Sequence, residues 1–178
     1  ERIDASGRVV TPLIEDEVRE AVAVLREAGA EALIIHFIHA YLNQDHERRA
    51  AEIARETWAN DHITLGSEVL REVREFERGS TAALNSYIQP IMTRYLSHLQ
   101  QRLKDAAFGH ELLVMQGNGG MMSATTAGKK AVHTVMSGPA AGSIAAAHLG
   151  SAAGFPNTIS CDMGGTSFDI AIVKGGVP

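Results

Sequence analysis

Hydrophobic positions in the first 65 residues follow two periodicities. Val18, Val22 and Leu25 recur at helical spacing, and Gly29 is a suitable residue to end that helix. The branched apolar run after Gly29 is typical of a buried strand. The predicted elements are a strand or hairpin over 1–12, a helix over 15–29, a strand over 32–39, a helix over about 45–59 and a strand over 63–65. This alternation predicts an α/β layer.

The second half begins with a long helical pattern over residues 75–106, which runs through Tyr87, Ile91 and Tyr95. Pro90 lies inside it and is expected to kink or split the helix. Charged sequence gives way to this helix at residues 70–80, where we place a possible domain boundary. The later predicted elements are a strand over 112–115, a short helix over 123–129, a helix over 139–152, and strands over 158–162 and 168–174.

Composition narrows the class of protein. Of the 178 residues, 45% are hydrophobic and the net charge is -5, which argues against nucleic-acid binding because a basic patch is expected there. No apolar run approaches the roughly 18 residues that cross a membrane. The single cysteine, Cys161, excludes a disulfide within the chain and favours a reducing compartment. We expect Cys161 to be a small buried residue whose side chain points away from Asp162.

The stretch from Asp162 to Ser167 carries the most specific chemistry. The paired Gly164 and Gly165 let backbone amides approach an anion, and Thr166 and Ser167 add hydroxyl donors. Asp162 ends an apolar strand beside them, and a carboxylate next to a phosphate needs a cation such as Mg²⁺, held largely through water. The alternative is a plain β-hairpin with residues 163–166 as its turn.

Two other glycine-containing segments are candidate ligand sites. Gly119 and Gly120 follow a predicted strand and would line a cleft, or form a simple strand-to-helix loop. Gly138 lies at the start of a predicted helix whose free amides suit an anion. The alternative for Gly138 is a structural helix start that packs closely through alanine and glycine.

Several segments, in the same order along the chain, resemble motifs of the hydantoinase A/5-oxoprolinase family. Asp-x-Gly-Gly-Thr-x-x-Asp at 162–169 is also similar to the phosphate loops of actin, Hsp70 and sugar-kinase ATPases. The other matching segments are His39–Glu47, Val73–Tyr87, Leu113–Gly120 and Ser137–Gly142. Departures from the family pattern are Gln44, Gly79 and Phe168, and Phe168 removes one possible hydroxyl beside the turn.

The resemblance implies a fragment of an actin/Hsp70-like (ribonuclease H-like) ATPase fold with an inserted helical segment. It implies that 1–72 ends an N-terminal hydantoinase/oxoprolinase domain and that 73–178 holds the long helix, the glycine-rich loops and the first hairpin of the ATPase lobe. The implied activity is ATP- and Mg²⁺-dependent activation of a cyclic amide carbonyl by phosphoryl transfer, in the cytoplasm, with Asp162 as the catalytic residue. A second, hydantoinase B-type subunit or domain is also implied. We expect this chain to be an internal piece that is inactive alone.

Three other functions remain open from the residues. The first is a subunit of a ketone carboxylase, the second a sugar kinase, and the third a nucleotide-binding subunit without catalytic activity. Sugar kinases carry their glycine loop near the start of the chain, whereas about 160 residues precede Asp162 here.

Histidines and a charge cluster need separate interpretation. His36 and His39 would point to opposite faces of one strand, so they cannot chelate a metal together. His39 and His46 occupy family positions and are either metal ligands or hydrogen-bonded residues at the edge of the core. Arg74, Glu75, Glu77 and Arg78 are expected to form a solvated helix face, with substrate contact as the alternative.

Overall fold

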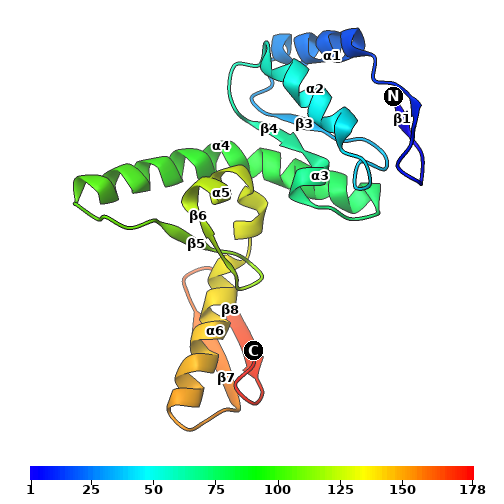
Figure 1. Ribbon diagram of the computed structural model, residues 1–178. Coiled ribbons are helices and arrows are strands. Elements are labelled where there is room, and N and C mark those ends of the chain that lie inside the picture. The colour runs from blue at the N-terminus through cyan, green and yellow to red at the C-terminus, as the bar shows by residue number, and fades with distance from the viewer. The chain divides into compact units, whose positions relative to one another are not determined.

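The computed structural model describes residues 1–178, which form two compact units (Figure 1). Unit 1 comprises Glu1–Tyr95 and Gly128–Val132, and unit 2 comprises Leu96–Ala127 and His133–Pro178. None of the helices is long and apolar enough to cross a membrane. The predicted α/β class is confirmed, because both units combine helices with short strands.

Unit 1 contains a small α/β layer. Its elements are β1 (Arg2–Ile3), β2 (Val9–Thr11), α1 (Glu15–Glu27), β3 (Leu33–Ile35), α2 (Asp45–Arg55), β4 (Ile63–Leu65), α3 (Gly66–Val69) and the first part of α4 (Glu75–Asp105). Strands β1 and β2 pair antiparallel, and β3 pairs parallel with β4, Leu33 opposite Ile63 and Ile35 opposite Leu65. Helix α2 therefore connects two parallel strands, as the alternation predicted.

The core of unit 1 lies between α1, α2 and the β3–β4 pair. It contains Val22, Leu33, Ile35, Ala50, Ala51, Ala54, Trp58, Ile63 and Leu65. The alanines of α2 let the helix approach the strands closely, and Trp58, the only tryptophan, fills the space after the helix ends. The strand predicted over 32–39 is wrong in extent, because only Leu33–Ile35 is a strand and a turn follows in which His39 has a φ of 60°.

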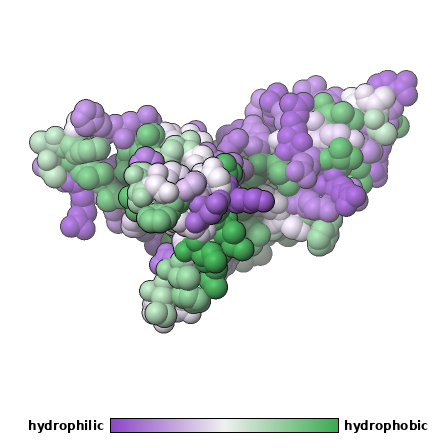
Figure 2. All heavy atoms as spheres, turned by 90° about the horizontal axis from the view of Figure 1, so that it is seen from below, coloured by the Kyte–Doolittle hydropathy of each residue, from purple (hydrophilic) through white to green (hydrophobic).

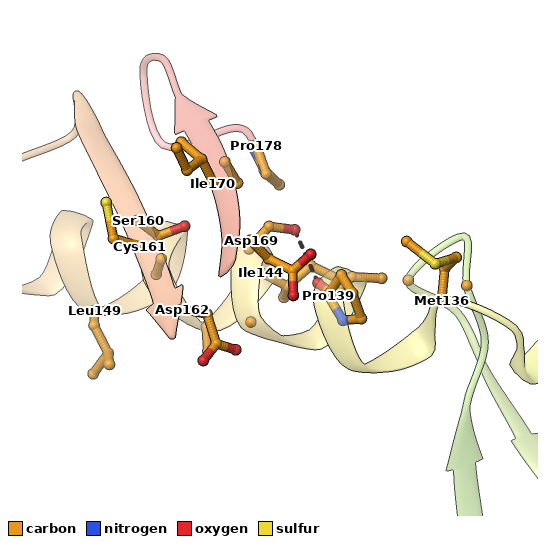
Figure 3. A pocket seen from close by; sticks show the side chains of 18 of the residues that line it. Met136, Pro139, Ile144, Leu149, Ser160, Cys161, Asp162, Asp169, Ile170 and Pro178 are labelled. Atoms are coloured by element: carbon orange, nitrogen blue, oxygen red, sulfur yellow. Dashed lines mark hydrogen bonds between the residues drawn. The ribbon is translucent and has the colours of Figure 1, made fainter. Parts of the chain in front are cut away.

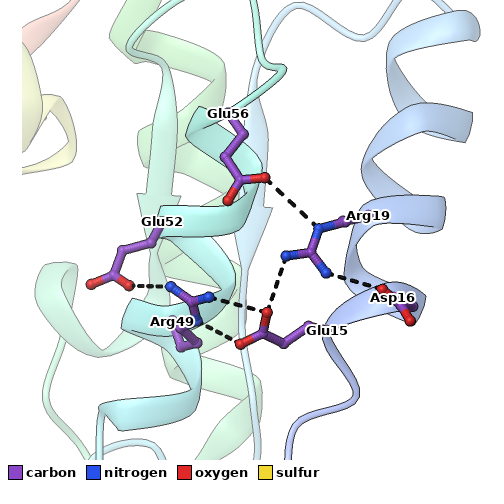
Figure 4. A network of polar contacts seen from close by, with 6 residues as sticks. All are labelled: Glu15, Asp16, Arg19, Arg49, Glu52 and Glu56. Carbon is purple, nitrogen blue, oxygen red and sulfur yellow. Dashed lines mark hydrogen bonds and ion pairs between the residues drawn. The ribbon is translucent and has the colours of Figure 1, made fainter.

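Charged residues cover the outward faces of α1 and α2 (Figure 4). Arg49 donates to Glu15 at 2.7 and 3.0 Å and to Glu52 at 2.9 Å. Arg19 contacts Glu15 and Asp16 within 3.1 Å. Hydrogen bonds from Arg49 lower the pKa of Glu15. Exposed pairs of this kind add little stability in salt, so the network mainly marks a surface that faces solvent.

Helix α4 turns a largely polar face toward the rest of unit 1. Asn85 donates to the Thr64 hydroxyl and to the Lys129 carbonyl at 3.1 Å each, and it accepts from the Val132 amide at 3.1 Å. Thr93 donates to the Gly128 carbonyl at 2.9 Å. These bonds fix the rotation of α4 about its axis.

Pro90 lies inside α4, and of the two predicted outcomes, a kink or a split of the helix, the split is wrong. Helix α4 continues from Glu75 to Asp105 as one element. An interior proline removes one backbone hydrogen bond and costs roughly 3 kcal/mol. The side-chain bonds of Asn85 and Thr93, on either side of Pro90, offset that cost and hold both halves of the helix in place.

His36 packs between two glycines and two buried charged groups. A Cβ on Gly66 would lie 2.6 Å from its Nδ1, and a Cβ on Gly79 would lie 3.2 Å from its Cδ2. Burial lowers the pKa of His36, Arg78 lowers it further, and Glu47 and Glu75 oppose the shift. The folded protein therefore favours the neutral ring.

Acidification is expected to destabilise unit 1 through His36. In the unfolded chain the ring binds a proton at about pH 6.5, but the folded state resists that proton, so stability present above pH 6.5 is lost as the pH falls below it. Urea unfolding followed by Trp58 fluorescence at pH 7.5 and pH 5.5 measures the loss. His36→Gln should reduce the difference in midpoint, whereas the exposed His148→Gln should leave it unchanged. An equal difference in the His36 variant would contradict this account.

Unit 2 consists of two hairpins and three further helical elements beside the end of α4. Its elements are β5 (Leu113–Met115), β6 (Met121–Ser123), α5 (Ala124–Lys129), η1 (Ala131–Thr134), α6 (Ser137–Ala152), β7 (Thr158–Met163) and β8 (Phe168–Val173), with the last residues of α5 and the first of η1 belonging to unit 1. Strand β6 was not predicted, and it makes residues 117–120 the turn of a β5–β6 hairpin, so the predicted strand-to-helix loop is wrong.

The C-terminal hairpin is the predicted one, with Met163 opposite Phe168 and Asp162 opposite Asp169. Its turn is Gly164–Ser167, one residue later than expected. Helix α6 packs against one face of the hairpin. The other face exposes large apolar residues, and strongly hydrophobic residues form a patch in Figure 2. The exposed hydrophobic residues of the hairpin are Ile159, Met163, Phe168, Ile170 and Ile172.

Cys161 lies on this outer face and is exposed, so the prediction of a buried cysteine is wrong. Cys161 is exposed because this hairpin has only two strands and only one of its faces is covered, by α6. The predicted direction is confirmed, since the Cys161 and Asp162 side chains point to opposite sides of β7 (Figure 3).

Replacing Gly150 of α6 with alanine is expected to destabilise unit 2. Glycine to alanine in a helix normally adds up to about 1 kcal/mol of stability. At Gly150, however, the new Cβ would lie 2.9 Å from the Phe155 carbonyl oxygen and 2.8 Å from Thr158 Cγ2, so overpacking should cost about 1–3 kcal/mol. Gly138→Ala, with nothing within 4 Å, is the control. Calorimetric melting of both variants tests the sign.

Candidate functional site

A cavity of about 770 Å³ lies in unit 2 between α6, the β7–β8 hairpin and the β5–β6 turn (Figure 3). Small residues of α6 form much of its wall, and two aspartates contribute from the strands. The polar or glycine residues that line it are Gly117, Asn118, Gly119, Gly142, Ser143, Ser160, Cys161, Asp162 and Asp169. The sequence-predicted Asp162 and Gly119 therefore share one cavity.

Asp162 and Asp169 sit directly opposite each other on neighbouring strands. Asp162 reaches over Gly142 of α6, where a Cβ would lie 3.5 Å from its Oδ2. Asp169 accepts a bond from the Ser167 hydroxyl at 3.2 Å. Like charges facing each other across a strand pair repel, so this pair suits a cation between or beside the carboxylates. Asp169 belongs to the recognised motif, but sequence reasoning did not count it among the site residues.

The turn itself stands clear of the cavity. Gly164, Gly165, Thr166 and Ser167 are exposed and do not line it. The Gly164 amide donates to the Ser167 carbonyl at 3.1 Å, which closes the turn. No side chain lies within 4 Å of a Cβ built on either glycine, so the amide of Gly165 and the Thr166 hydroxyl remain open to an anion.

The β5–β6 turn places Gly119 in the cavity wall and Gly120 outside it. Gly119 has a φ of 85°, and a Cβ there would lie 2.7 Å from Ile144 Cδ1 of α6. Asn118 Oδ1 accepts from the Gly120 amide at 2.9 Å, which fixes the turn. Gly119 thus has a packing reason to be glycine, and the role of Gly120 is to end the turn.

Helix α6 starts at the cavity with no side-chain cap. Met136 precedes it with a φ of 62°, and the Ala140 amide bonds back to the Met136 carbonyl at 3.1 Å. Gly138 does not line the cavity, although Met136 and Pro139 on either side of it do. An uncapped helix start supplies positive potential near one end of the cavity.

Taken together, the lining residues suit a magnesium-bound polyphosphate. No lysine, arginine or histidine lines the cavity, so its own charged groups are the two carboxylates. Carboxylates prefer Mg²⁺ with several of its waters retained, and uncrowded amides prefer phosphate oxygens. The residues therefore fit a phosphate group accompanied by a cation and do not fit a bare anion, which Asp162 and Asp169 would repel.

No three histidine, cysteine, aspartate or glutamate side chains are grouped closely enough to bind a metal ion. His46 Nδ1 lies 2.7 Å from Glu1 Oε2, and the His39 ring contacts Tyr41. The argument that His36 and His39 alternate on one strand no longer applies, because both residues follow β3.

Arg74, Glu75, Glu77 and Arg78 were predicted to form a solvated helix face, and this prediction is wrong for Arg78. Its side chain is 0% exposed, donates to the carbonyls of Glu72 and Phe37 at 2.6 and 2.9 Å, and lies over the Tyr41 ring. Arg74 and Glu77 do form an exposed ion pair at 3.6 Å.

Sequence comparison establishes the family. The profile described as hydantoinase/oxoprolinase matches residues 78–178, and the profile described as hydantoinase/oxoprolinase N-terminal region matches residues 1–58. The chain belongs to the hydantoinase/oxoprolinase family. The resemblance found in the motifs is thereby confirmed.

Among curated relatives, the acetophenone carboxylase gamma subunit of Aromatoleum aromaticum is 34% identical over 97% of this chain and 24% of its own length. The caprolactamase subunit alpha of Pseudomonas jessenii is 33% identical over 98% of this chain and 25% of its own length. The 5-oxoprolinase of Saccharomyces cerevisiae is 32% identical over 92% of this chain and 12% of its own length. The chain thus spans about a quarter or less of the curated relatives it matches.

Two solved structures share the fold of this chain. Nucleotide-free acetone carboxylase, described as ATP-dependent, has a TM-score of 0.87 at 32% identity over 98% of this chain and 25% of its own. The ATP-dependent caprolactamase of Pseudomonas jessenii has a TM-score of 0.82 at 31% identity over 96% of this chain and 25% of its own.

Proposed function

We propose that the parent protein is an ATP-dependent cyclic amidohydrolase of the hydantoinase/5-oxoprolinase type, and that this chain supplies part of its nucleotide site. The observation that supports this proposal most directly is the cavity that Asp162 and Asp169 share with the start of α6 and the Gly119 turn. In this proposal the β7–β8 hairpin opens an actin-like ATPase lobe within residues 73–178, and residues 1–72 end the N-terminal domain.

Different residues bind the phosphate groups and position the cation. The Gly165 amide and the Thr166 and Ser167 hydroxyls bind phosphate oxygens, and the Gly164 amide closes the turn that holds them. Gly119, Gly120 and Gly138 keep the backbone near the nucleotide free of side chains. Asp162 orients Mg²⁺ through water. Bound ATP supplies the γ-phosphoryl group that activates the substrate carbonyl oxygen, and bound Mg²⁺ neutralises the charge on the phosphates. The contribution of this chain is positioning and electrostatic stabilisation.

A ketone carboxylase subunit is the second candidate. It is supported by the acetone carboxylase structure, whose TM-score of 0.87 compares with 0.82 for caprolactamase, and by similar identities to carboxylase and lactamase subunits.

The test measures ATP turnover by the full-length parent, with its second subunit, in the presence of different substrates. Turnover that depends on 5-oxoproline, a hydantoin or caprolactam supports the proposed amidohydrolase. Turnover that requires acetone or acetophenone with bicarbonate supports the carboxylase instead. Sugar-dependent turnover, or nucleotide binding with no substrate-dependent turnover, would overturn both.

A further inference from the structure

Asn85 of α4 is a buried residue whose side chain holds one short piece of backbone. It is 0% exposed. It donates to the Lys129 carbonyl and accepts from the Val132 amide, both at 3.1 Å. Its second amide hydrogen is donated to the Thr64 hydroxyl at 3.1 Å. Every polar group of this side chain is therefore used, and two of its three bonds are made to the backbone where α5 meets η1.

The junction of α5 and η1 needs these bonds because its own backbone does not supply them. The last carbonyls of a helix have no partner within the helix, and α5 ends at Lys129. Asn85 donates to the Lys129 carbonyl, and Thr93, also on α4, donates to the Gly128 carbonyl at 2.9 Å. A short 3₁₀ helix such as η1 has poor internal hydrogen-bond geometry, so the bond from the Val132 amide helps to hold it. Side chains of α4 thus set the conformation of this junction.

The same 3₁₀ helix leads on to the cavity. His133, the residue after Val132, accepts a hydrogen bond from the Gly117 amide at 2.7 Å. Gly117 belongs to the β5–β6 turn and lines the cavity, and Met136, which precedes α6 with a φ of 62°, lines it as well. Residues 133–136 therefore hold the glycine turn and lead into α6, which are two parts of the wall of the proposed nucleotide site.

We propose that Asn85, assisted by Thr93, is a positioning residue of the nucleotide site, an inference that rests on the proposed function. Asn85 does not line the cavity. It keeps the α5–η1 junction in one conformation, in which the His133 carbonyl is directed at the Gly117 amide and the turn is ordered before the nucleotide arrives. When these bonds are lost, η1 loosens, and part of the free energy of nucleotide binding is used to order the turn.

A purely structural role of Asn85 within unit 1 is the alternative, and Thr64→Val separates the two. Thr64 is 3% exposed, and its hydroxyl accepts from Asn85 and donates to Gln89 at 3.3 Å. Thr64→Val therefore disturbs the same buried polar cluster but keeps the bonds of Asn85 to Lys129 and Val132. This control should destabilise unit 1 and leave the nucleotide site unchanged.

The affinity of the full-length parent for MgATP measures the effect. Asn85→Ala should weaken MgATP binding about 10-fold, Thr93→Val about threefold, and Thr64→Val less than about twofold. Trp58 fluorescence identifies a temperature at which each variant is folded. An unchanged affinity in Asn85→Ala, or an equal loss in Thr64→Val, would overturn the proposal. If Asn85→Ala does not fold, Thr93→Val decides, and an affinity equal to that of the unsubstituted parent would count against the proposal.

Hydrogen exchange distinguishes failure of this proposal from failure of the proposed function. In the parent without nucleotide, the Gly117 amide should exchange roughly 10-fold faster in Asn85→Ala and at an unchanged rate in Thr64→Val. An unchanged rate in Asn85→Ala overturns the proposal, whether or not the protein binds nucleotide. Because coupling is reciprocal, MgATP should also slow exchange of the Val132 amide in the unsubstituted parent. A parent that binds no MgATP would overturn the proposed function, and with it the role of Asn85, even where the exchange rates are as expected.

Discussion

Asp162→Ala in the full-length parent is expected to lower substrate-dependent ATP turnover by roughly 100- to 1,000-fold. Asp162 is exposed in the cavity and bonds to no other side chain, so its loss should hardly affect folding. Turnover should fall because the variant lacks the negative charge that would hold Mg²⁺ and its waters. Turnover measured at saturating ATP and substrate, together with the thermal midpoint, separates the catalytic effect from a stability effect.

Cys161→Ala is the matched control for this experiment. It changes the neighbouring residue of the same strand, whose side chain points to the opposite face (Figure 3). Turnover in the control should stay within about twofold, because Cys161 borders the cavity but its side chain points away from Asp162 (Figure 3). Near-normal turnover in Asp162→Ala would remove Asp162 from the mechanism. Raising the Mg²⁺ concentration should partly restore the variant if the carboxylate acts by holding the cation.

Glu47→Ala is expected to cause the largest loss of stability, about 3–5 kcal/mol. Glu47 is 0% exposed, and its carboxylate accepts from the Phe37 amide at 2.9 Å, the Ser67 amide at 3.0 Å and the Ser67 hydroxyl at 2.6 Å. Removing it leaves three donors unpaired, two of which are buried. Unit 1 should melt at least about 10 °C lower, as followed by Trp58 fluorescence.

Glu52→Ala, on the exposed side of the same helix, is the control and should shift the midpoint by about 2 °C or less. Glu47→Gln retains one acceptor oxygen, so its loss should lie between the two. A thermal midpoint for Glu47→Ala within the range of the control would mean that water or neighbouring groups replace the carboxylate. The hydrogen bonds of Glu47 would then not stabilise unit 1.

The same residues show how far the sequence alone can predict this structure. Local patterns gave α1, α2, α6 and the β7–β8 hairpin with small errors at their ends, because apolar spacing and glycine position are local signals. Helix α3 was missed because the group that binds its first amides is Glu47, twenty residues earlier. Strand β6 has three residues, too few for a periodic pattern.

The candidate site was only partly predictable for the same reason. The motif identified Asp162 and Gly119, which the structure places in one cavity, but not Gly142, whose missing side chain leaves room for Asp162. Arg78 looked like a surface residue because no pattern shows that the Phe37 and Glu72 carbonyls need a donor. The functional roles of the predicted site residues all stay predictions: Asp162, Gly119, Gly120, Gly138, Gly164, Gly165, Thr166 and Ser167.

The packing of α6 on the β7–β8 hairpin joins residues such as Gly142 and Asp162, 20 positions apart, whereas unit 1 depends on bonds such as the one between Asn85 and Val132, 47 positions apart. Closing short loops costs less chain entropy than closing long ones, and contacts between nearby residues form faster. After denaturation, the hairpin and α6 should therefore regain their packing before the α4 anchors re-form. In a refolding time course followed by hydrogen exchange, the packing of α6 on the hairpin would recover before protection of the Val132 amide, which donates to Asn85.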